Sequence, residues 1–332
     1  MNRNQTIDLF RFIAAFFILC LHNYYGNVSS EIVENIRVGA RWAVPFFFMC
    51  SGYFLKSKIE SNNIFDFKCI EKNIVNLISV LFISSIVYFF FHWVQLDVRA
   101  LLLGAYWHLW FLGSMIFGFV FIWYIFYLRL HRLMWIISIS ILFFVIISDS
   151  YDQFLGLNID YQFFRFLQSI PFIYIGYRIS LIDKPVLSKN VLLVFIMVGF
   201  ILQYAEVYMF EKLFNYSRYE HSILIGTIVL LVPGFIYLTR VHVGNTLFSN
   251  WGRKYSLFIY LYHLLLFHFF DFILLRLFSS EILLTIRPYY PVLGLFAITG
   301  LAIILEKYFT KVYEILNGNF SYISNMVNKS GK

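Results

Sequence analysis

The sequence predicts an all-α, polytopic membrane protein with about ten transmembrane helices and both termini in the cytoplasm. Of the 332 residues, 61% are hydrophobic and 22% aromatic, whereas only 13% are charged. Soluble domains carry about 25% charged residues, so this composition excludes an ordinary soluble enzyme. About 20 apolar residues cross a bilayer, and the chain divides into ten such segments: 7–26, 37–56, 74–95, 105–128, 133–149, 162–181, 190–210, 221–239, 255–275 and 289–309.

The connections between these segments are short, and no Pro, Gly or Ser-rich linker or internal repeat interrupts them. A second soluble domain therefore has no place, and we expect residues 1–332 to form a single membrane domain. With ten spans, 17 of the 26 Lys and Arg residues fall on the side of the termini and six on the other. Because cytoplasmic loops retain positive charge, this asymmetry predicts cytoplasmic termini.

The net charge of +8 is accounted for mainly by this topology. No motif typical of nucleic-acid recognition is present, so we expect no nucleic-acid partner. The three cysteines have no paired spacing and no neighbouring histidine cluster, and we expect neither disulfides nor a metal site.

The first segment, DLFRFIAAFFILCLHN at residues 8–23, carries three ionisable groups: Asp8, Arg11 and His22. Ionisable groups inside a membrane are costly and are candidates for function. Arg11 and His22 are eleven residues apart, which returns nearly to the same side of a helix about 16 Å further along. Asp8 lies three residues before Arg11 and can pair with it.

Other polar groups lie toward the opposite, predicted outer end of later segments. These candidates for substrate binding are Arg41, His108, Trp110, Arg165 and Glu206. Together they predict a polar cavity that opens to the outside. Simpler roles remain open for each residue: a structural Asp8–Arg11 ion pair, interfacial anchoring of Trp110 and the histidines, snorkelling arginines, or an interhelical hydrogen bond from His22.

An imidazole that takes a proton from a hydroxyl, with a guanidinium to stabilise the resulting oxyanion, can perform acyl transfer. No GxSxG elbow, Walker loop, GxGxxG or HExxH motif occurs in the chain. Direct attack by an acceptor hydroxyl is therefore favoured over an acyl-serine, and ATPase, dinucleotide-dependent and zinc-protease functions are excluded.

Five blocks of the chain resemble the acyltransferase-3 family of integral-membrane enzymes, which modify bacterial surface polysaccharides. Arg11 and His22 match the family's pattern of arginine, ten residues and histidine on the first helix. The resemblance continues through RWAVPFFFMCSGYFL (41–55), YWHLWFL (106–112), FRFLQSIPFIYIGYRIS (164–180) and YSLFIYLYH (255–263).

The resemblance implies an enzyme of the bacterial inner membrane that transfers an acyl group. The donor would be acetyl-CoA or another acyl-CoA from the cytoplasm, with no permanently bound cofactor. The acceptor would be a hydroxyl of a glycan or lipid-linked glycan such as O antigen or capsule. It also implies that Arg11 and His22 are required, with Asp8 as the partner of Arg11. Many members carry an arginine cluster after the second helix, where this chain has Lys68 and Lys72 as candidate donor-binding residues.

A second interpretation comes from the membrane part of membrane-bound serine racemases, which is similar in the same blocks. That domain is thought to import serine, and an arginine and a glutamate in a membrane cavity suit a zwitterion as well. Transport of a small zwitterion is therefore the alternative function.

Overall fold

The protein is all-α, as the sequence predicts. The computed structural model describes residues 4–56, 67–92, 103–156, 161–182, 184, 187–215 and 222–319, and no strand occurs among them. The helices are α1 (Gln5–His22), α2 (Ser30–Ala40), α3 (Ala43–Tyr53), α5 (Lys68–His92), α7 (Trp110–Tyr127), α8 (Leu133–Asp149), α9 (Asp152–Leu155), α10 (Tyr161–Leu167), α11 (Ser169–Ser180), α12 (Lys189–Phe214), α13 (Ile225–Arg240), α14 (Leu247–Leu277), α15 (Ser280–Ile286), η2 (Arg287–Tyr289), α16 (Tyr290–Tyr308) and α17 (Thr310–Leu316).

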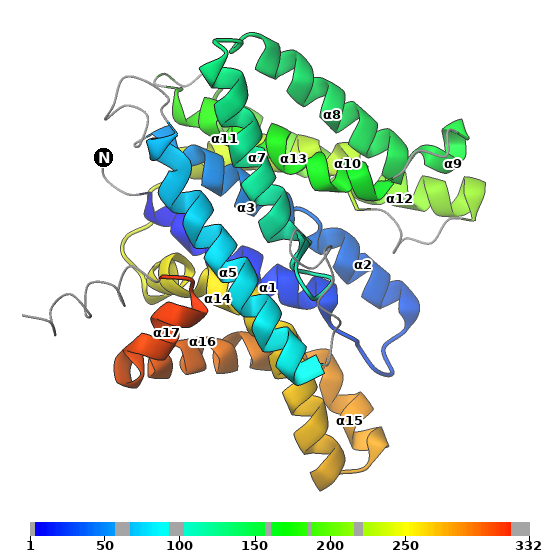
Figure 1. Cartoon of the computed structure of the whole chain (residues 1–332). Coiled ribbons are helices and arrows are strands. Elements are labelled where there is room, and N and C mark those ends of the chain that lie inside the picture. Colours follow the sequence, from blue (N-terminus) through cyan, green and yellow to red (C-terminus); the bar gives the residue numbers. More distant parts are fainter. Residues whose placement is uncertain are drawn as a thin grey trace, which may run out of the picture.

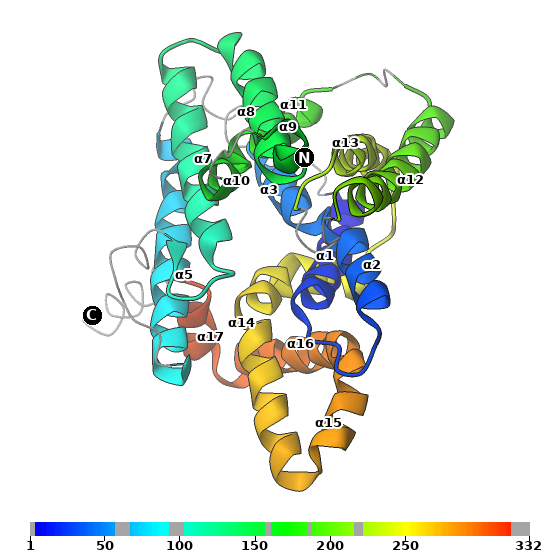
Figure 2. The same ribbon diagram turned by 90° about the vertical axis from the view of Figure 1, so that its right-hand side faces the viewer.

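Helix α1 is central in the bundle (Figures 1 and 2) and packs against α2, α3, α13, α14 and α16. Its first turn is capped by Asn4, whose Oδ1 accepts hydrogen bonds from the backbone N–H groups of Thr6 and Ile7 at 3.0 and 3.2 Å. An apolar helix in this position buries residues on most of its sides. The polar groups it carries therefore face other helices.

Six helical segments in the described part of the chain are long and apolar enough to cross a membrane. They are Gln5–His22, Lys68–Phe91, Trp110–Tyr127, Lys189–Phe214, Leu247–Leu277 and Ser280–Tyr308. The other four predicted segments correspond to two shorter apolar helices, α8 and α13, and to two interrupted pairs, α2 with α3 and α10 with α11. The chain is thus a multi-pass membrane protein, and the number of ten spans stays a prediction.

The two interruptions differ from the continuous helices that hydropathy predicts at 37–56 and 162–181. In each pair the second helix has proline at its third position, Pro45 in α3 and Pro171 in α11. A proline has no N–H for the carbonyl four residues earlier, and its ring collides with that carbonyl. Those carbonyls belong to Arg41, the residue that follows α2, and to Leu167, the last residue of α10.

The helix ends rich in Lys and Arg gather at one end of the bundle. Asn4 donates to the carbonyls of Leu238 and Thr239 at the end of α13, and Lys254 pairs with Glu306 at 2.7 Å. At the opposite end, Arg37 donates to the carbonyl of Asn23 at 3.1 Å. This arrangement agrees with the predicted separation of charge, and the assignment of the basic end to the cytoplasm stays a prediction.

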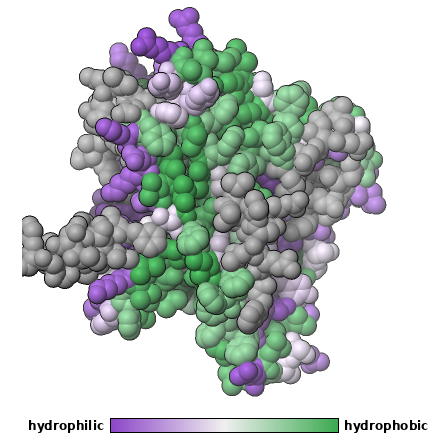
Figure 3. All heavy atoms as spheres, viewed as in Figure 1, coloured by the Kyte–Doolittle hydropathy of each residue, from purple (hydrophilic) through white to green (hydrophobic). Residues whose placement is uncertain are grey.

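Apolar side chains dominate the face shown in Figure 3, with hydrophilic residues toward its edges. On α5, for example, Phe82 and Phe90 are 57% and 69% exposed. Helices α8 and α12 expose similar apolar stripes, which include Ile139 and Ile201. Hydrocarbon chains are the solvent that such surfaces suit.

Helices α1 and α14 approach each other closely at Gly252, near the basic end. A Cβ atom at Gly252 would lie 1.9 Å from the carbonyl oxygen of Asp8. This contact sets the spacing of the two helices that carry His22 and His263, so it positions the candidate site.

We expect Gly252→Ala to destabilise the protein by about 1–3 kcal/mol, because the added methyl group must push α1 away from α14. Thermal unfolding in detergent measures the change. Gly300→Ala in α16 is the matched control, since no atom lies within 4 Å of its Cβ position. That variant should be neutral or slightly stabilising. Equal unfolding temperatures for the two variants would contradict the role assigned to Gly252.

Candidate functional site

Arg11 and Asp8 form an ion pair on α1, as their spacing predicts. Arg11 Nη1 donates to Asp8 Oδ1 at 3.4 Å. The carboxylate is buried, at 3% exposed, whereas the guanidinium side chain retains 20% exposure. Arg11 is therefore held at one end by Asp8 and remains accessible at the other.

The accessible part of Arg11 lines a cavity of about 300 Å³ between α1, α3, α5, α7 and α14. Its polar lining includes Arg11, Ser51, Asn73, Asn76 and Ser256. Aromatic rings, among them Phe111 and Tyr260, complete the wall. A site with a cation, amides, hydroxyls and aromatic rings suits a flexible ligand that carries both polar groups and an apolar chain.

Three histidines from three segments form a cluster at the other end of α1: His22, His108 and His263, called here the histidine cluster. The His22 and His263 rings stack at 5.4 Å between centroids with 18° between planes. His108, just before α7, lies edge-on to His263, also at 5.4 Å. His108 and His263 are 1% and 0% exposed, while His22 is half-buried.

Trp107 forms the accessible side of this cluster. Its ring is edge-on to His22 at 4.6 Å, and the residue is 55% exposed. His22 thus lies between a buried imidazole and an exposed indole.

Tyr260 connects the histidine cluster with the cavity that Arg11 lines. Its ring lines the cavity and also lies 5.7 Å from His108 and 6.3 Å from His263. Its hydroxyl donates to the backbone carbonyl of His108. The cavity and the cluster are therefore adjacent, with one aromatic side chain between them.

Arg165 and Trp110 form a cation–π pair beside the cluster. The Arg165 guanidinium lies 4.4 Å from the centre of the Trp110 ring. Arg165 also acts electrostatically on His22 and Tyr260. The structure thus brings His108, Trp110 and Arg165 to the surroundings of His22.

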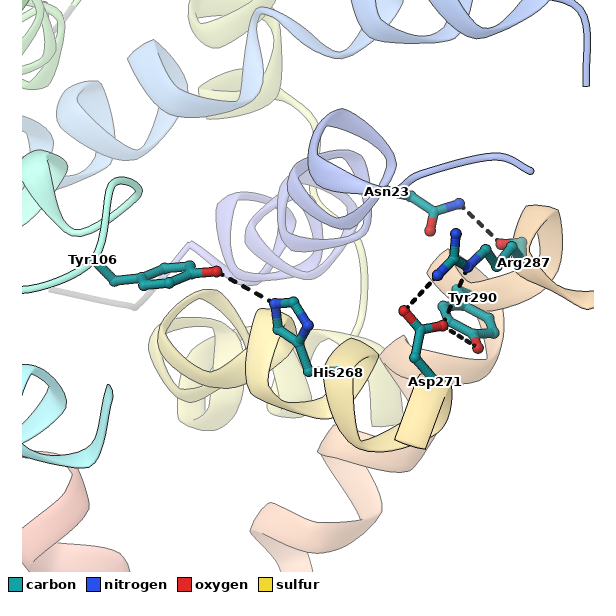
Figure 4. Close-up of polar contacts among 6 residues, drawn as sticks. All are labelled: Asn23, Tyr106, His268, Asp271, Arg287 and Tyr290. Atoms are coloured by element: carbon teal, nitrogen blue, oxygen red, sulfur yellow. Dashed lines mark hydrogen bonds and ion pairs between the residues drawn. The ribbon is translucent and has the colours of Figure 1, made fainter. Parts of the chain in front are cut away.

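Two separate groups of polar contacts lie near the end of α1 (Figure 4). Arg287 donates to both carboxylate oxygens of Asp271, at 3.2 and 2.8 Å, and Tyr290 donates to Asp271 Oδ1 at 2.8 Å. Asn23 donates to the carbonyl of Arg287 at 3.0 Å, while Tyr106 bonds His268 at 3.3 Å. These contacts connect α14 with the segment before α7, and α1 with η2, α14 and α16.

The two remaining outer-end candidates have other neighbours. Arg41 is 7% exposed at the junction of α2 and α3, within electrostatic range of Asp149 at the end of α8. Glu206 accepts hydrogen bonds from Tyr151 Oη at 2.6 Å and from the backbone N–H groups of Ile225 and Gly226 at 3.1 and 2.7 Å. Glu206 therefore caps the start of α13, and its expected contact with an acceptor hydroxyl stays a prediction.

We expect Glu206→Ala to lower stability by about 1–3 kcal/mol, because the buried N–H groups at the start of α13 lose their acceptor. Thermal unfolding in detergent checks this. Glu206→Gln keeps one acceptor oxygen and should therefore lose less stability than Glu206→Ala. If Glu206→Ala unfolds at the normal temperature and only acceptor binding weakens, the capping role is wrong.

Lys68 and Lys72 are exposed at the start of α5. They precede Asn73 and Asn76, which line the Arg11 cavity. Residues four apart share one side of a helix, so Lys68, Lys72 and Asn76 form a row that leads toward the cavity. This position is compatible with their expected role toward an anionic donor.

Sequence reasoning did not single out Trp107, Tyr260 or His263. All three lie in the blocks YWHLWFL and YSLFIYLYH, and a histidine within the apolar run of α14 was an available signal for His263. Among the residues that the structure describes, no group of three or more His, Cys, Asp or Glu could hold a metal ion. The arrangement can move a proton at His22 and stabilise negative charge with Arg165 or Arg11.

Comparison with known proteins identifies the family of the chain. The family model described as an acyltransferase domain, that of the acyltransferase-3 family, matches residues 4–307. An amino-acid racemase of Enterococcus faecalis is 30% identical over 131 residues, which are 35% of this chain. A second amino-acid racemase of the same organism is 45% identical over 67 residues, 19% of this chain.

The matched segments make up only 19% and 9% of the length of those two relatives. No solved structure matches the chain. The family match, in contrast, extends over nearly the whole chain and includes Arg11, His22, the Arg11 cavity and the histidine cluster. The chain therefore belongs to the acyltransferase-3 family of membrane acyltransferases.

Proposed function

We propose that this protein is an O-acyltransferase of the bacterial inner membrane that moves an acetyl group from acetyl-CoA to a hydroxyl of a cell-surface glycan. The proposal depends on one observation. Helix α1 carries the accessible guanidinium of Arg11 in a cavity and, at its other end, the half-buried imidazole of His22. The family supports acyl transfer, and the two ends of α1 suit the two substrates.

The Arg11 cavity is the proposed donor site. Acyl-CoA carries phosphates and a flexible arm with amide groups that ends in a thioester. The exposed Lys68 and Lys72 would attract the phosphates, while Asn73 and Asn76 offer hydrogen bonds to the arm. Arg11, anchored by Asp8, is placed to contact the donor inside the cavity.

The histidine cluster is the proposed acceptor side. His22 takes the proton of the acceptor hydroxyl as its oxygen attacks the thioester carbonyl, and a tetrahedral oxyanion forms. Arg165 stabilises that oxyanion. Collapse then breaks the carbon–sulfur bond, the CoA thiolate leaves, and the proton on His22 returns to it, so that the products are an ester and free CoA. The Tyr260 ring must shift for the thioester to reach His22 from the cavity.

Transfer of label tests the proposal. Purified protein in liposomes is supplied with acetyl-CoA carrying a radiolabelled acetyl group, together with bacterial surface polysaccharide. We expect label in the glycan, released by mild alkali as an ester requires. Absence of label with every polysaccharide and lipid-linked precursor tested would refute the proposed function.

Transport of a zwitterionic amino acid is the second candidate, and the similarity to the amino-acid racemases favours it. The ammonium group of such a substrate requires a hydrogen-bond acceptor in the protein, preferably a carboxylate. Three carboxylates described near that end of the bundle, however, bond other groups: Asp271 bonds Arg287 and Tyr290, Glu206 caps α13, and Asp149 accepts from the backbone N–H groups of Ser222 and Ile223. Uptake of labelled serine into liposomes, without label transfer to glycan, would favour this candidate.

A further inference from the structure

One serine in the wall of the Arg11 cavity has a hydroxyl group without a hydrogen bond. Ser256, on α14, is buried and lines the cavity, and its Oγ has no partner among the protein atoms that the structure describes. Ser51, the other serine of the lining, instead donates to the carbonyl of Phe47 at 3.0 Å. A buried hydroxyl that is left unsatisfied is costly and requires an explanation.

Ser256 lies between the two functional ends of the cavity. Four residues earlier on α14, Gly252 packs against the backbone of Asp8, which pairs with Arg11. Four residues later, Tyr260 lines the same cavity and borders the histidine cluster. Residues four apart share one side of a helix and are separated by about 6 Å along it. Ser256 is therefore one turn short of Tyr260 on the way from Arg11 to the cluster.

The chemistry of a hydroxyl group selects the part of a donor that Ser256 can bind. A serine hydroxyl both donates and accepts a hydrogen bond. The arm of an acyl-CoA has two amide groups, each with a carbonyl acceptor and an N–H donor, and its remaining atoms near the thioester are methylene groups and sulfur. Those atoms suit the apolar side chains that α7 contributes to the lining, among them Phe111 and Met115. An amide is thus the group of the arm that matches this hydroxyl.

We propose that the Ser256 hydroxyl binds the amide group nearest the thioester of the acyl donor and thereby places the thioester beside Tyr260. This inference rests on the proposed function, in which the donor occupies the Arg11 cavity. Two methylene groups and the sulfur separate that amide from the thioester carbonyl, a length close to one helical turn, about 5.4 Å. The thioester then lies one turn beyond Ser256, next to the ring that borders the histidine cluster. A bond from Ser256 to the thioester itself would hold the reacting carbon one turn farther from His22.

The stability of the ligand-free protein separates a ligand contact from a structural hydrogen bond. Ser256→Ala removes a hydroxyl that has no partner in the described part of the protein. The unfolding temperature without donor should therefore stay the same or rise. Thermal unfolding in detergent measures it, and a clear fall would overturn the inference, because the hydroxyl would then serve the fold.

Binding of a donor analogue that cannot react tests the contact itself. The parent probe is S-ethyl-CoA, which has a thioether in place of the thioester. The matched probe is identical except that two methylene groups replace the amide nearest the sulfur. Isothermal titration on the full chain in detergent gives both dissociation constants. The wild type should bind the parent probe about tenfold more tightly than the matched probe, the effect of one hydrogen bond in a buried site.

Three serine variants locate this preference. Ser256→Ala should bind both probes about equally, because only its affinity for the parent probe falls. Ser256→Cys retains a weak donor and should show an intermediate preference, which keeps the test available if the alanine variant fails to fold. Ser138→Ala is the matched control. Ser138 on α8 is also buried, and its hydroxyl also lacks a partner among the described protein atoms, but it does not line the cavity. Its preference should equal that of the wild type.

The outcomes keep this inference apart from the proposed function. A preference for the parent probe that persists in Ser256→Ala, or that is absent from the wild type, would overturn the inference, while label transfer to glycan would still support the acyltransferase. Selective loss of affinity for acetyl-CoA relative to S-ethyl-CoA in Ser256→Ala would also overturn it, because the hydroxyl would then contact the thioester carbonyl. The expected preferences without any label in glycan would instead establish the amide contact and refute the proposed acyl transfer.

Discussion

Replacing His22 with glutamine should lower kcat for acyl transfer by about 10²- to 10⁴-fold, the usual contribution of a positioned general base. The amide cannot take the proton of the attacking hydroxyl, so the step must proceed through water. The KM for acetyl-CoA should change little, because His22 is not among the residues that line the cavity with Arg11. Steady-state label transfer over a range of acetyl-CoA concentrations up to saturation measures both constants.

His268→Gln is the matched control for this prediction. His268 lies one and a half turns beyond His263 on α14 and bonds Tyr106. Its replacement removes an imidazole close to the same end of the bundle but outside the histidine cluster, and kcat should remain within a few-fold of normal. Near-normal turnover in a well-folded His22→Gln protein would remove His22 from the mechanism.

The second large effect is expected at Arg11. Arg11→Ala should raise the KM for acetyl-CoA by about 10- to 100-fold, the range for loss of a hydrogen bond to a charged group. The same change also removes a cation from beside the buried Asp8 carboxylate, which should lower thermal stability. Donor titrations and thermal unfolding in detergent separate the two effects.

The double variant Arg11→Ala with Asp8→Asn distinguishes a donor-binding arginine from a structural one. Neutralising Asp8 should restore most of the lost stability, since the buried charge is gone, but it should not restore the KM. Arg11→Lys keeps the charge but lacks the planar guanidinium, so its KM for acetyl-CoA should lie between those of the wild type and Arg11→Ala. If the double variant recovers both stability and KM, Arg11 serves only the ion pair.

Much of the fold was predictable from the sequence because a bilayer imposes a simple rule on it. Every backbone polar group in hydrocarbon must be satisfied within its own segment, so apolar runs of sufficient length become helices. The interruptions at Arg41 and Leu167 were less evident. Pro45 and Pro171 are visible in the sequence, yet Pro233 lies inside an uninterrupted α13. Whether a proline ends a helix depends on whether neighbouring helices can satisfy the carbonyl it leaves free.

The candidate site, like the fold, was only partly predictable from the sequence. The sequence by itself determined that Asp8, Arg11 and His22 share one helix of a multi-pass helical membrane protein, because apolar length, helical periodicity and the cost of charge in hydrocarbon act within a segment. The family is recognised separately, from the similarity of its sequence blocks. Only the tertiary structure decided that His263 stacks on His22, that Tyr260 lies between the cluster and the cavity, and that Glu206 caps α13. Those contacts join segments far apart along the chain, and the close packing of side chains between helices selects them.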